Sequence, residues 1–196
     1  MCIVLDAGHG GVDGGVVGRE TGVKESDLNL AVTMKLKTVL ERAGFDVVLT
    51  RKTEAGLYGA ATTGFKKRDM QKRKEIIEEA KPVAVISVHQ NFYPTRTTRG
   101  GQVFYRTGSE SGKKLAEGIQ NQFNLLYAEE GVSPRTAAKG DYYMLKCTDY
   151  TSVIAECGFF SNRADESLLV AESFQERVAE AIYAGLIGYF SAVSGA

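Results

Sequence analysis

Apolar and polar positions follow two different periods along the chain. Short runs rich in Val and Ile are separated by longer segments in which apolar residues recur every three or four positions. This order is typical of an α/β domain with a largely parallel sheet. The short runs predict strands at residues 2–6, 46–50, 83–88, 101–105, 142–145 and 152–156.

The longer segments predict helices between these strands. The clearest covers residues 26–43, and Gly44 is placed to end it as a glycine C-cap. Further helices are predicted at residues 66–80, 111–127 and 174–190, with loops at 52–65, 92–100 and 129–141. We therefore expect a single α/β domain over residues 1–196, with a central, mostly parallel six-stranded sheet flanked by helices on both faces.

Composition agrees with one domain and excludes some classes of partner. Hydrophobic residues make up 43% of the 196 positions, which is enough for a core without disulfides. Lys and Arg number 24, as do Asp and Glu, so no net field attracts nucleic acid or an anionic membrane. An apolar run of about eighteen residues would be needed for a membrane span, and none is predicted.

The cysteines do not predict a disulfide framework. Cys2, Cys147 and Cys157 are odd in number and lack the C-x-x-C spacing of a metal knuckle. We expect all three to be buried small residues, with a bridge between Cys147 and Cys157 as the alternative.

The two histidines of the chain occupy matching places. His9 and His89 each follow a Val- and Ile-rich predicted strand. The carboxyl ends of parallel strands face a common ligand crevice, so the two side chains can converge although they are distant in sequence. The alternative is two unrelated polar residues at strand ends.

A carboxylate near the first histidine offers a third ligand. Glu25 opens the predicted helix at 26–43, where the helix dipole favours a negative charge whatever its function. Ser26 or Asp27 could cap the helix instead, which would free Glu25 to bind a metal. Two imidazoles and one carboxylate are a known catalytic zinc set, and Glu20 is the rival ligand.

Glu156 ends the last predicted strand, which is otherwise apolar. Glutamate is seldom buried without a partner, so at the strand tip it is either exposed or placed there for a function. Beside a zinc-bound water it could accept a proton and return it to a leaving amine. Cys157 would point to the opposite face of the strand, so we expect no cysteine nucleophile.

Five blocks of sequence, in this order, resemble the zinc-dependent N-acetylmuramoyl-L-alanine amidases of the amidase type 3 family (AmiC/CwlV type). The blocks are residues 3–11 (IVLDAGHGG) with 13–15 (DGG), 24–25 (KE) with 27–30 (DLNL), 48–51 (VLTR), 86–91 (ISVHQN) and 154–162 (IAECGFFSN). The resemblance extends over essentially the whole chain. It implies a single catalytic domain that hydrolyses the amide between the lactyl group of N-acetylmuramic acid and L-alanine of the peptidoglycan stem peptide.

The resemblance also implies roles for particular residues. His9, Glu25 and His89 match the family's ligands for Zn²⁺, which is why Glu25 is preferred to Glu20. Glu156 matches the catalytic glutamate.

Other features of the family are matched with small departures. Arg73 matches an arginine on the family's second helix and is interpreted as structural. Ala7, Gln90 and Cys157 stand where proline, a small residue, and threonine or valine are common. The short loop at 13–15 and the compact length are also similar to spore-cortex amidases.

Partners and location follow from the implied substrate. We expect peptidoglycan as partner, no nucleic acid, and an extracytoplasmic location in the cell wall, the periplasm or the medium, as for a bacterial autolysin. An export signal would then have to precede Met1. Between His89 and Glu156 we expect no insertion that blocks the site, while a separate activator protein stays open.

Three rival functions were weighed. A zinc peptidase or deacylase acting on another amide could use the same metal set. A non-catalytic peptidoglycan-binding relative is disfavoured because all four key residues are present. A phosphate-cradling role for glycines 8–15 is disfavoured because both G-x-G-x-x-G and the P-loop Gly-Lys-Ser/Thr ending are missing.

Overall fold

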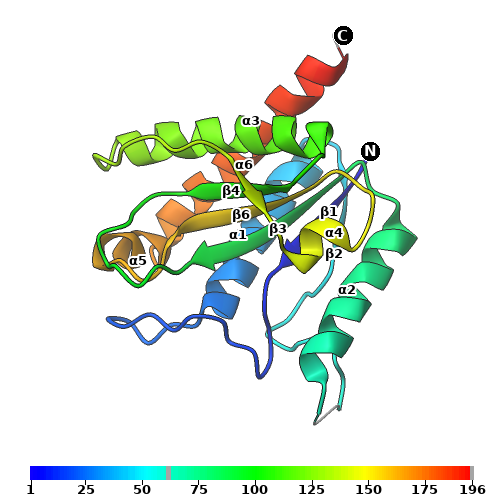
Figure 1. The fold of residues 1–196 in the computed structure, drawn as a ribbon, viewed down its shortest axis with the longest axis horizontal. Helices are drawn as coiled ribbons and strands as arrows, with labels where there is room; N and C mark the ends of the chain where they lie inside the picture. Colours follow the sequence, from blue (N-terminus) through cyan, green and yellow to red (C-terminus); the bar gives the residue numbers. More distant parts are fainter. Residues whose placement is uncertain (61–62, 195–196) are drawn as a thin grey trace.

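A six-stranded sheet forms the centre of the molecule, in a computed structural model that describes residues 1–60 and 63–194 (Figure 1). The strands are β1 (Cys2–Ala7), β2 (Asp46–Leu49), β3 (Ala84–Asn91), β4 (Gln102–Arg106), β5 (Ala138–Gly140) and β6 (Ser152–Phe159). Their order across the sheet is β2-β1-β3-β6-β4-β5. All neighbouring pairs are parallel except β4 and β6, which confirms the predicted, mostly parallel sheet.

Helices cover both faces of the sheet, as predicted. They are α1 (Glu25–Arg42), α2 (Phe65–Ala80), α3 (Glu110–Ala128), α4 (Tyr143–Lys146), α5 (Arg163–Leu169) and α6 (Glu172–Ser194). In Figure 1, α2 and α4 lie in front of the sheet, and α1 and α6 lie behind it. The larger apolar core lies between the sheet and α1, α3 and α6, while a smaller one joins the other face to α2 and α4.

Two glycines allow α3 and α6 to pack backbone against backbone. A Cβ atom on Gly118 would lie 2.8 Å from the carbonyl oxygen of Gly185. A Cβ atom on Gly185 would in turn meet the backbone of Ile119. The close approach therefore depends on the missing side chains at both positions.

The predicted strand at 142–145 is wrong, because this segment forms the short helix α4. Met144 and Leu145 are adjacent, and both are buried in the smaller core. Adjacent strand residues point to opposite faces, whereas a helical turn can direct both inward. Strand β5 lies instead inside the predicted loop at 129–141, and α5 was not predicted. Residues 61–62 of the predicted loop at 52–65 lie outside the described residues.

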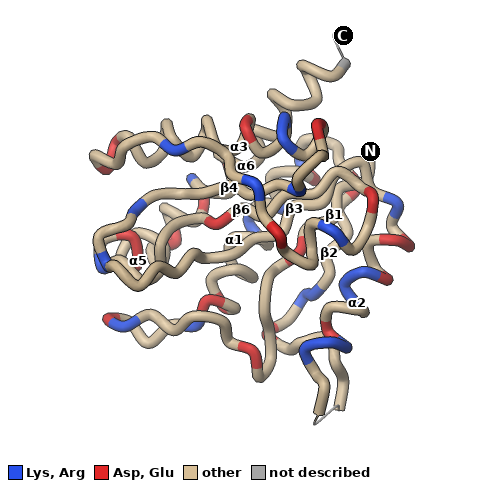
Figure 2. Tube along the Cα trace, in the orientation of Figure 1, with Lys and Arg blue, Asp and Glu red and all other residues tan. Residues whose placement is uncertain are grey.

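The three cysteines are free, and only one of them is buried. Cys157 is buried, whereas Cys2 and Cys147 are half-buried, which corrects the expectation for these two. Among the described residues, no helix is long and apolar enough to cross a membrane. Acidic and basic residues are interspersed over the molecule in Figure 2, in keeping with the equal numbers of the two charges.

Candidate active site

The two histidines lie beside each other at one edge of the sheet. β1 and β3 are parallel neighbours with Ala7 opposite Val88, so the residues that follow meet at their carboxyl ends. The amide of Gly8 donates to the carbonyl of Val88 at 3.0 Å, which continues the pairing up to the histidines. The rings of His9 and His89 meet edge to face, with centroids 5.0 Å apart. Sequence reasoning predicted this convergence.

Glu25 joins the two histidines. Its Oε1 atom lies 3.3 Å from Nε2 of His9 and 3.1 Å from Nδ1 of His89. One ligand atom from each residue lies within 4.8 Å of the others, which is a spacing that can hold a metal ion. Among the described residues this is the one such group of His, Cys, Asp and Glu, and it does not include Glu20. Glu20 instead pairs with Arg96 at 3.4 Å.

The Glu25 carboxylate is buried and held by hydrogen bonds. It accepts from the amide of Val16 at 2.9 Å, the amide of Gln90 at 3.2 Å and the side chain of Asn29 at 3.3 Å. Burial alone would raise the pKa of Glu25, but hydrogen bonds and charge from His89 and His9 outweigh it and hold the pKa far below the usual value. The carboxylate is therefore charged at neutral pH. Lys24 is the N-cap of α1, and Glu25 is its first residue.

Two glycines make room for the side chains of His89 and Glu25. A Cβ atom on Gly8 would collide with the ring of His89, and one on Gly15 would collide with the carboxylate of Glu25. Gly15 also has a φ of +66°, in the region that favours glycine. Part of the glycine cluster near the N-terminus therefore allows the close approach of the clustered side chains.

Two buried arginines fix the backbone that carries His9. Arg73 donates to the carbonyls of Ala7 at 2.8 Å and His9 at 2.6 Å, and it forms an ion pair with Asp6. Arg51 donates to the carbonyls of Ala7 at 2.9 Å and Gly8 at 3.0 Å. His9 itself has a φ of +60°, which is unusual for a residue with a side chain and needs such support. These contacts agree with a structural role for Arg73.

Glu156 lies next to the histidine and glutamate cluster. It pairs with His89 across β3 and β6, so both side chains emerge on the same face of the sheet. The side chain is buried, and its Oε2 atom has no hydrogen-bond partner among the described residues. Burial raises the pKa of Glu156 to about 7, only partly offset by the neighbouring histidines. A carboxyl with such a pKa can both accept and donate a proton near neutrality.

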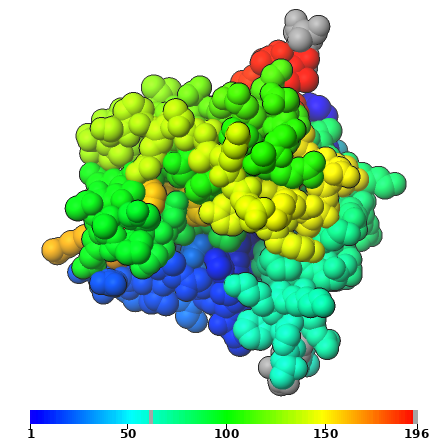
Figure 3. All heavy atoms as spheres, viewed as in Figure 1, coloured from blue at the N-terminus to red at the C-terminus, as the bar shows by residue number. Residues whose placement is uncertain are grey.

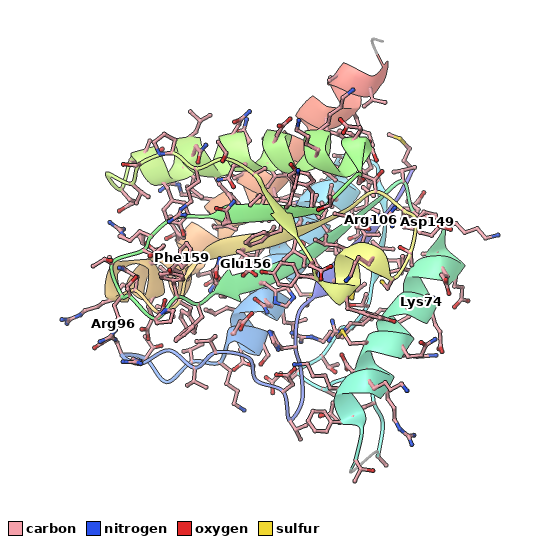
Figure 4. The ribbon with its side chains drawn as sticks, in the orientation of Figure 1. Lys74, Arg96, Arg106, Asp149, Glu156 and Phe159 are labelled. Carbon is pink, nitrogen blue, oxygen red and sulfur yellow. The ribbon has the colours of Figure 1, made fainter. Side chains whose placement is uncertain are left out.

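A cavity of about 450 Å³ opens onto this cluster. It is lined by His9, Glu25, His89 and Glu156, and also by apolar and aromatic side chains. The latter are Val16, Met70, Phe92, Tyr142, Tyr143 and Met144. Figure 3 shows a hollow where the N-terminal segment meets α2 and the segment around α4. Figure 4 places Glu156 near the middle of the sheet, with Arg96 toward one end and Arg106 and Asp149 toward the other.

Sequence reasoning missed several residues that support the site. Asp13 contacts Nδ1 of His9 at 2.9 Å, although only its place in a sequence block had been noted. Asn29 and Gln90 hydrogen-bond to each other at 3.1 Å behind Glu25. An acidic residue four positions after a candidate histidine ligand was the available signal for Asp13. The role of Gln90 depends on long-range packing that the sequence does not display.

Comparison with known protein families gives a match over most of the chain. The family described as N-acetylmuramoyl-L-alanine amidase matches residues 3–188. The germination-specific N-acetylmuramoyl-L-alanine amidase of Bacillus subtilis is 31% identical over 192 residues, which cover 96% of this chain and 79% of that protein.

Solved structures give the same result. The CwlD amidase from Clostridioides difficile, solved in complex with the GerS lipoprotein, is similar with a TM-score of 0.92 and 35% identity, covering 97% of this chain and 98% of that one. The catalytic domain of CwlV, an N-acetylmuramoyl-L-alanine amidase from Bacillus (Paenibacillus) polymyxa, has a TM-score of 0.83 and 28% identity, with coverages of 97% and 98%.

Proposed function

The chain belongs to the N-acetylmuramoyl-L-alanine amidase family, and from this membership we propose that it is a zinc-dependent enzyme of peptidoglycan turnover. The bond cleaved is the amide between the lactyl group of N-acetylmuramic acid and L-alanine of the stem peptide. The observation that carries the proposal is the group of His9, Glu25 and His89 with the buried Glu156 beside it.

The three clustered residues fit Zn²⁺. Two imidazole nitrogens and one carboxylate oxygen form a donor set typical of catalytic zinc, which leaves a position for water or substrate. The low pKa of Glu25 keeps its carboxylate charged, as a ligand must be. The glycines at positions 8 and 15 leave the space that His89 and Glu25 occupy.

Bound Zn²⁺ would supply a Lewis acid that acidifies water and polarises the amide carbonyl. Glu156 performs the proton transfers. Its buried carboxylate takes a proton from the attacking water and returns it to the departing alanine nitrogen, so that the amine leaves as a neutral group. The Oε2 atom of Glu156 has no hydrogen-bond partner among the described residues, so no protein group competes there for the carboxylate.

The walls of the cavity suit a peptide-bearing sugar. Aromatic side chains such as Phe92 and Tyr143 are about half-exposed at the rim, where they can cover the apolar faces of a ligand. The segment between His89 and Glu156 forms β4, α3, β5 and α4, and the cavity beside it is open. Access to the site therefore needs no prior displacement of a blocking helix.

Location and partners follow from the substrate. Peptidoglycan lies outside the cytoplasmic membrane, so we assign the working protein to the cell wall, the periplasm or the medium. The similar CwlD amidase was solved with a lipoprotein, and a separate protein that activates this chain is compatible with the proposal.

Turnover of purified peptidoglycan tests the proposal. The zinc-loaded protein should release peptides with a free N-terminal alanine and leave the glycan intact, as identified by mass spectrometry. A chelator should stop the release, and added zinc should restore it. Cleavage within the stem peptide or loss of acetyl groups would instead support the peptidase or deacylase alternatives.

A further inference from the structure

We propose that Asp13 is a positioning residue that fixes the tautomer and ring orientation of His9 and thereby presents Nε2 to the metal. The proposal rests on the zinc site proposed above. It assigns a function to a residue of the loop between β1 and α1 that touches neither the substrate nor the metal in this scheme.

The two ring nitrogens of His9 face different partners. Nδ1 lies 2.9 Å from Oδ1 of Asp13, and Nε2 lies 3.3 Å from Oε1 of Glu25 on the other edge of the ring. A neutral imidazole carries one proton, and a carboxylate oxygen faces each ring nitrogen. The contact of Nδ1 with Asp13, at 2.9 Å, is shorter than that of Nε2 with Glu25, at 3.3 Å, so it favours the proton on Nδ1. Nε2 then keeps its lone pair free on the side where Glu25 and His89 lie.

The carboxylate of Asp13 is itself held in place by its own loop. The amide of Gly10 donates to the Asp13 carbonyl at 2.8 Å, and the amide of Asp13 donates back to the Gly10 carbonyl at 3.3 Å. The amide of Gly15 donates to Oδ1 of Asp13 at 3.2 Å. The loop thus closes a short turn directly after His9 and brings the carboxylate back to the imidazole.

The backbone of His9 is fixed independently of Asp13. Arg73 binds its carbonyl oxygen at 2.6 Å, which secures the main chain but leaves rotation of the ring unspecified. His89 differs, because its ring lies over Gly8 and is oriented by packing. Asp13 therefore fixes the ring orientation of His9, whereas close packing fixes the ring orientation of His89.

Other charges near Asp13 leave it available to His9. Lys66 lies at 4.0 Å from Oδ2, and its side chain is 73% exposed, so water screens this pair strongly. The contact with His9 uses the other oxygen, Oδ1.

The test is zinc affinity of the full chain, measured by competition with a chromophoric chelator. Asp13→Asn keeps the shape of the side chain and removes its charge, and it should weaken zinc binding about 10- to 100-fold. Asp149→Asn is the matched control, because Asp149 is fully exposed and pairs with Arg106 away from the site. The control should bind zinc as the unchanged protein does.

A second measurement begins with the unchanged protein, and that part of it does not depend on the variant folding. Nitrogen NMR of the metal-free, unchanged protein, at a pH where the ring is neutral, should show the proton of His9 on Nδ1. Asp13→Asn should shift the population toward the other tautomer.

The outcomes separate this inference from the proposed function. Equal zinc affinity of Asp13→Asn and the unchanged protein would overturn the role of Asp13 and leave the zinc site standing. If the unchanged protein binds no zinc, the proposed function fails, and the tautomer measurement alone decides whether Asp13 orients His9. A proton found on Nε2 would overturn the inference in either case.

Discussion

In the proposed reaction, Glu156 transfers protons and does not bind the metal. Replacing it by glutamine keeps its shape but removes its capacity to accept a proton. We expect Glu156→Gln to lower the rate of peptidoglycan cleavage by about 10²- to 10⁴-fold, because general acid–base catalysis contributes effects of that order. Zinc content, measured by metal analysis, should be unchanged, since Glu156 lies outside the metal-binding group. Near-normal turnover by the variant would remove Glu156 from the mechanism.

The buried position of Glu156 should also appear in the stability of the metal-free protein. Its pKa rises from an ordinary value near 4.5 to about 7 in the folded state, so folding favours the protonated form. The contribution of protonated Glu156 to the free energy of unfolding is fully present below about pH 4.5 and is lost as the pH rises through about 7. Glu156→Gln stays neutral at every pH.

The free energy of unfolding of Glu156→Gln, relative to that of the unchanged protein, should therefore increase by up to about 3 kcal/mol as the pH rises from about 4.5 to about 7. Urea unfolding of both chelator-treated proteins at a series of pH values measures the difference. A constant difference across the range would show that burial does not disfavour the charged form of Glu156.

At the residue scale, the sequence predicts the clustered side chains of the candidate site better than the residues that hold them in place. The ends of the predicted strands indicate that His9 and His89 converge, and the family blocks add Glu25 to them. In the structure the three side chains lie together. Arg51 and Asp13 hold the loop after β1 through backbone carbonyls and an imidazole nitrogen. Such contacts depend on the path of a glycine-rich loop, which local periodicity does not describe.

At the element scale, the packing of α3 against α6 makes a clear prediction. Gly185→Ala should destabilise the protein by about 1–3 kcal/mol, because the new Cβ atom meets the backbone of α3. Gly188→Ala is the matched control on the same helix, since a Cβ atom there meets no atom of the described residues within 4 Å. The control should be neutral or more stable by up to about 1 kcal/mol, because alanine favours helix.

Unfolding in urea measures both variants. A Gly185→Ala protein as stable as the Gly188→Ala protein would mean that the two helices can separate slightly at no cost.

The elements themselves were predicted where their periodicity is strong. The four long helices and five of the six strands follow from buried apolar runs and helical spacing. The missed elements are the short ones, α4, α5 and β5. α4 is four residues long and β5 three, and at this length period-two and period-3.6 patterns do not differ.

At the scale of the whole molecule, the proposed metal should stabilise the fold. A ligand that binds only the folded state adds stability by mass action, about 2.7 kcal/mol at a concentration 100-fold above its dissociation constant. The midpoint temperature of thermal unfolding should therefore rise when zinc is added to chelator-treated protein. His89→Ala should lose most of this shift, while Glu156→Gln should retain it. An equal shift in both variants would place zinc elsewhere.

The order of the strands also determines when the site can exist. β6 carries Glu156 and lies between β3 and β4, although it is made after both. During synthesis or translocation from the N-terminus, the emerging chain lacks the strand that lies between β3 and β4 until residue 159 has appeared. Strands β3 and β4 cannot both pair with β6 earlier, and Glu156 is absent until then. The candidate site is therefore incomplete until β6 has been made and has paired with β3.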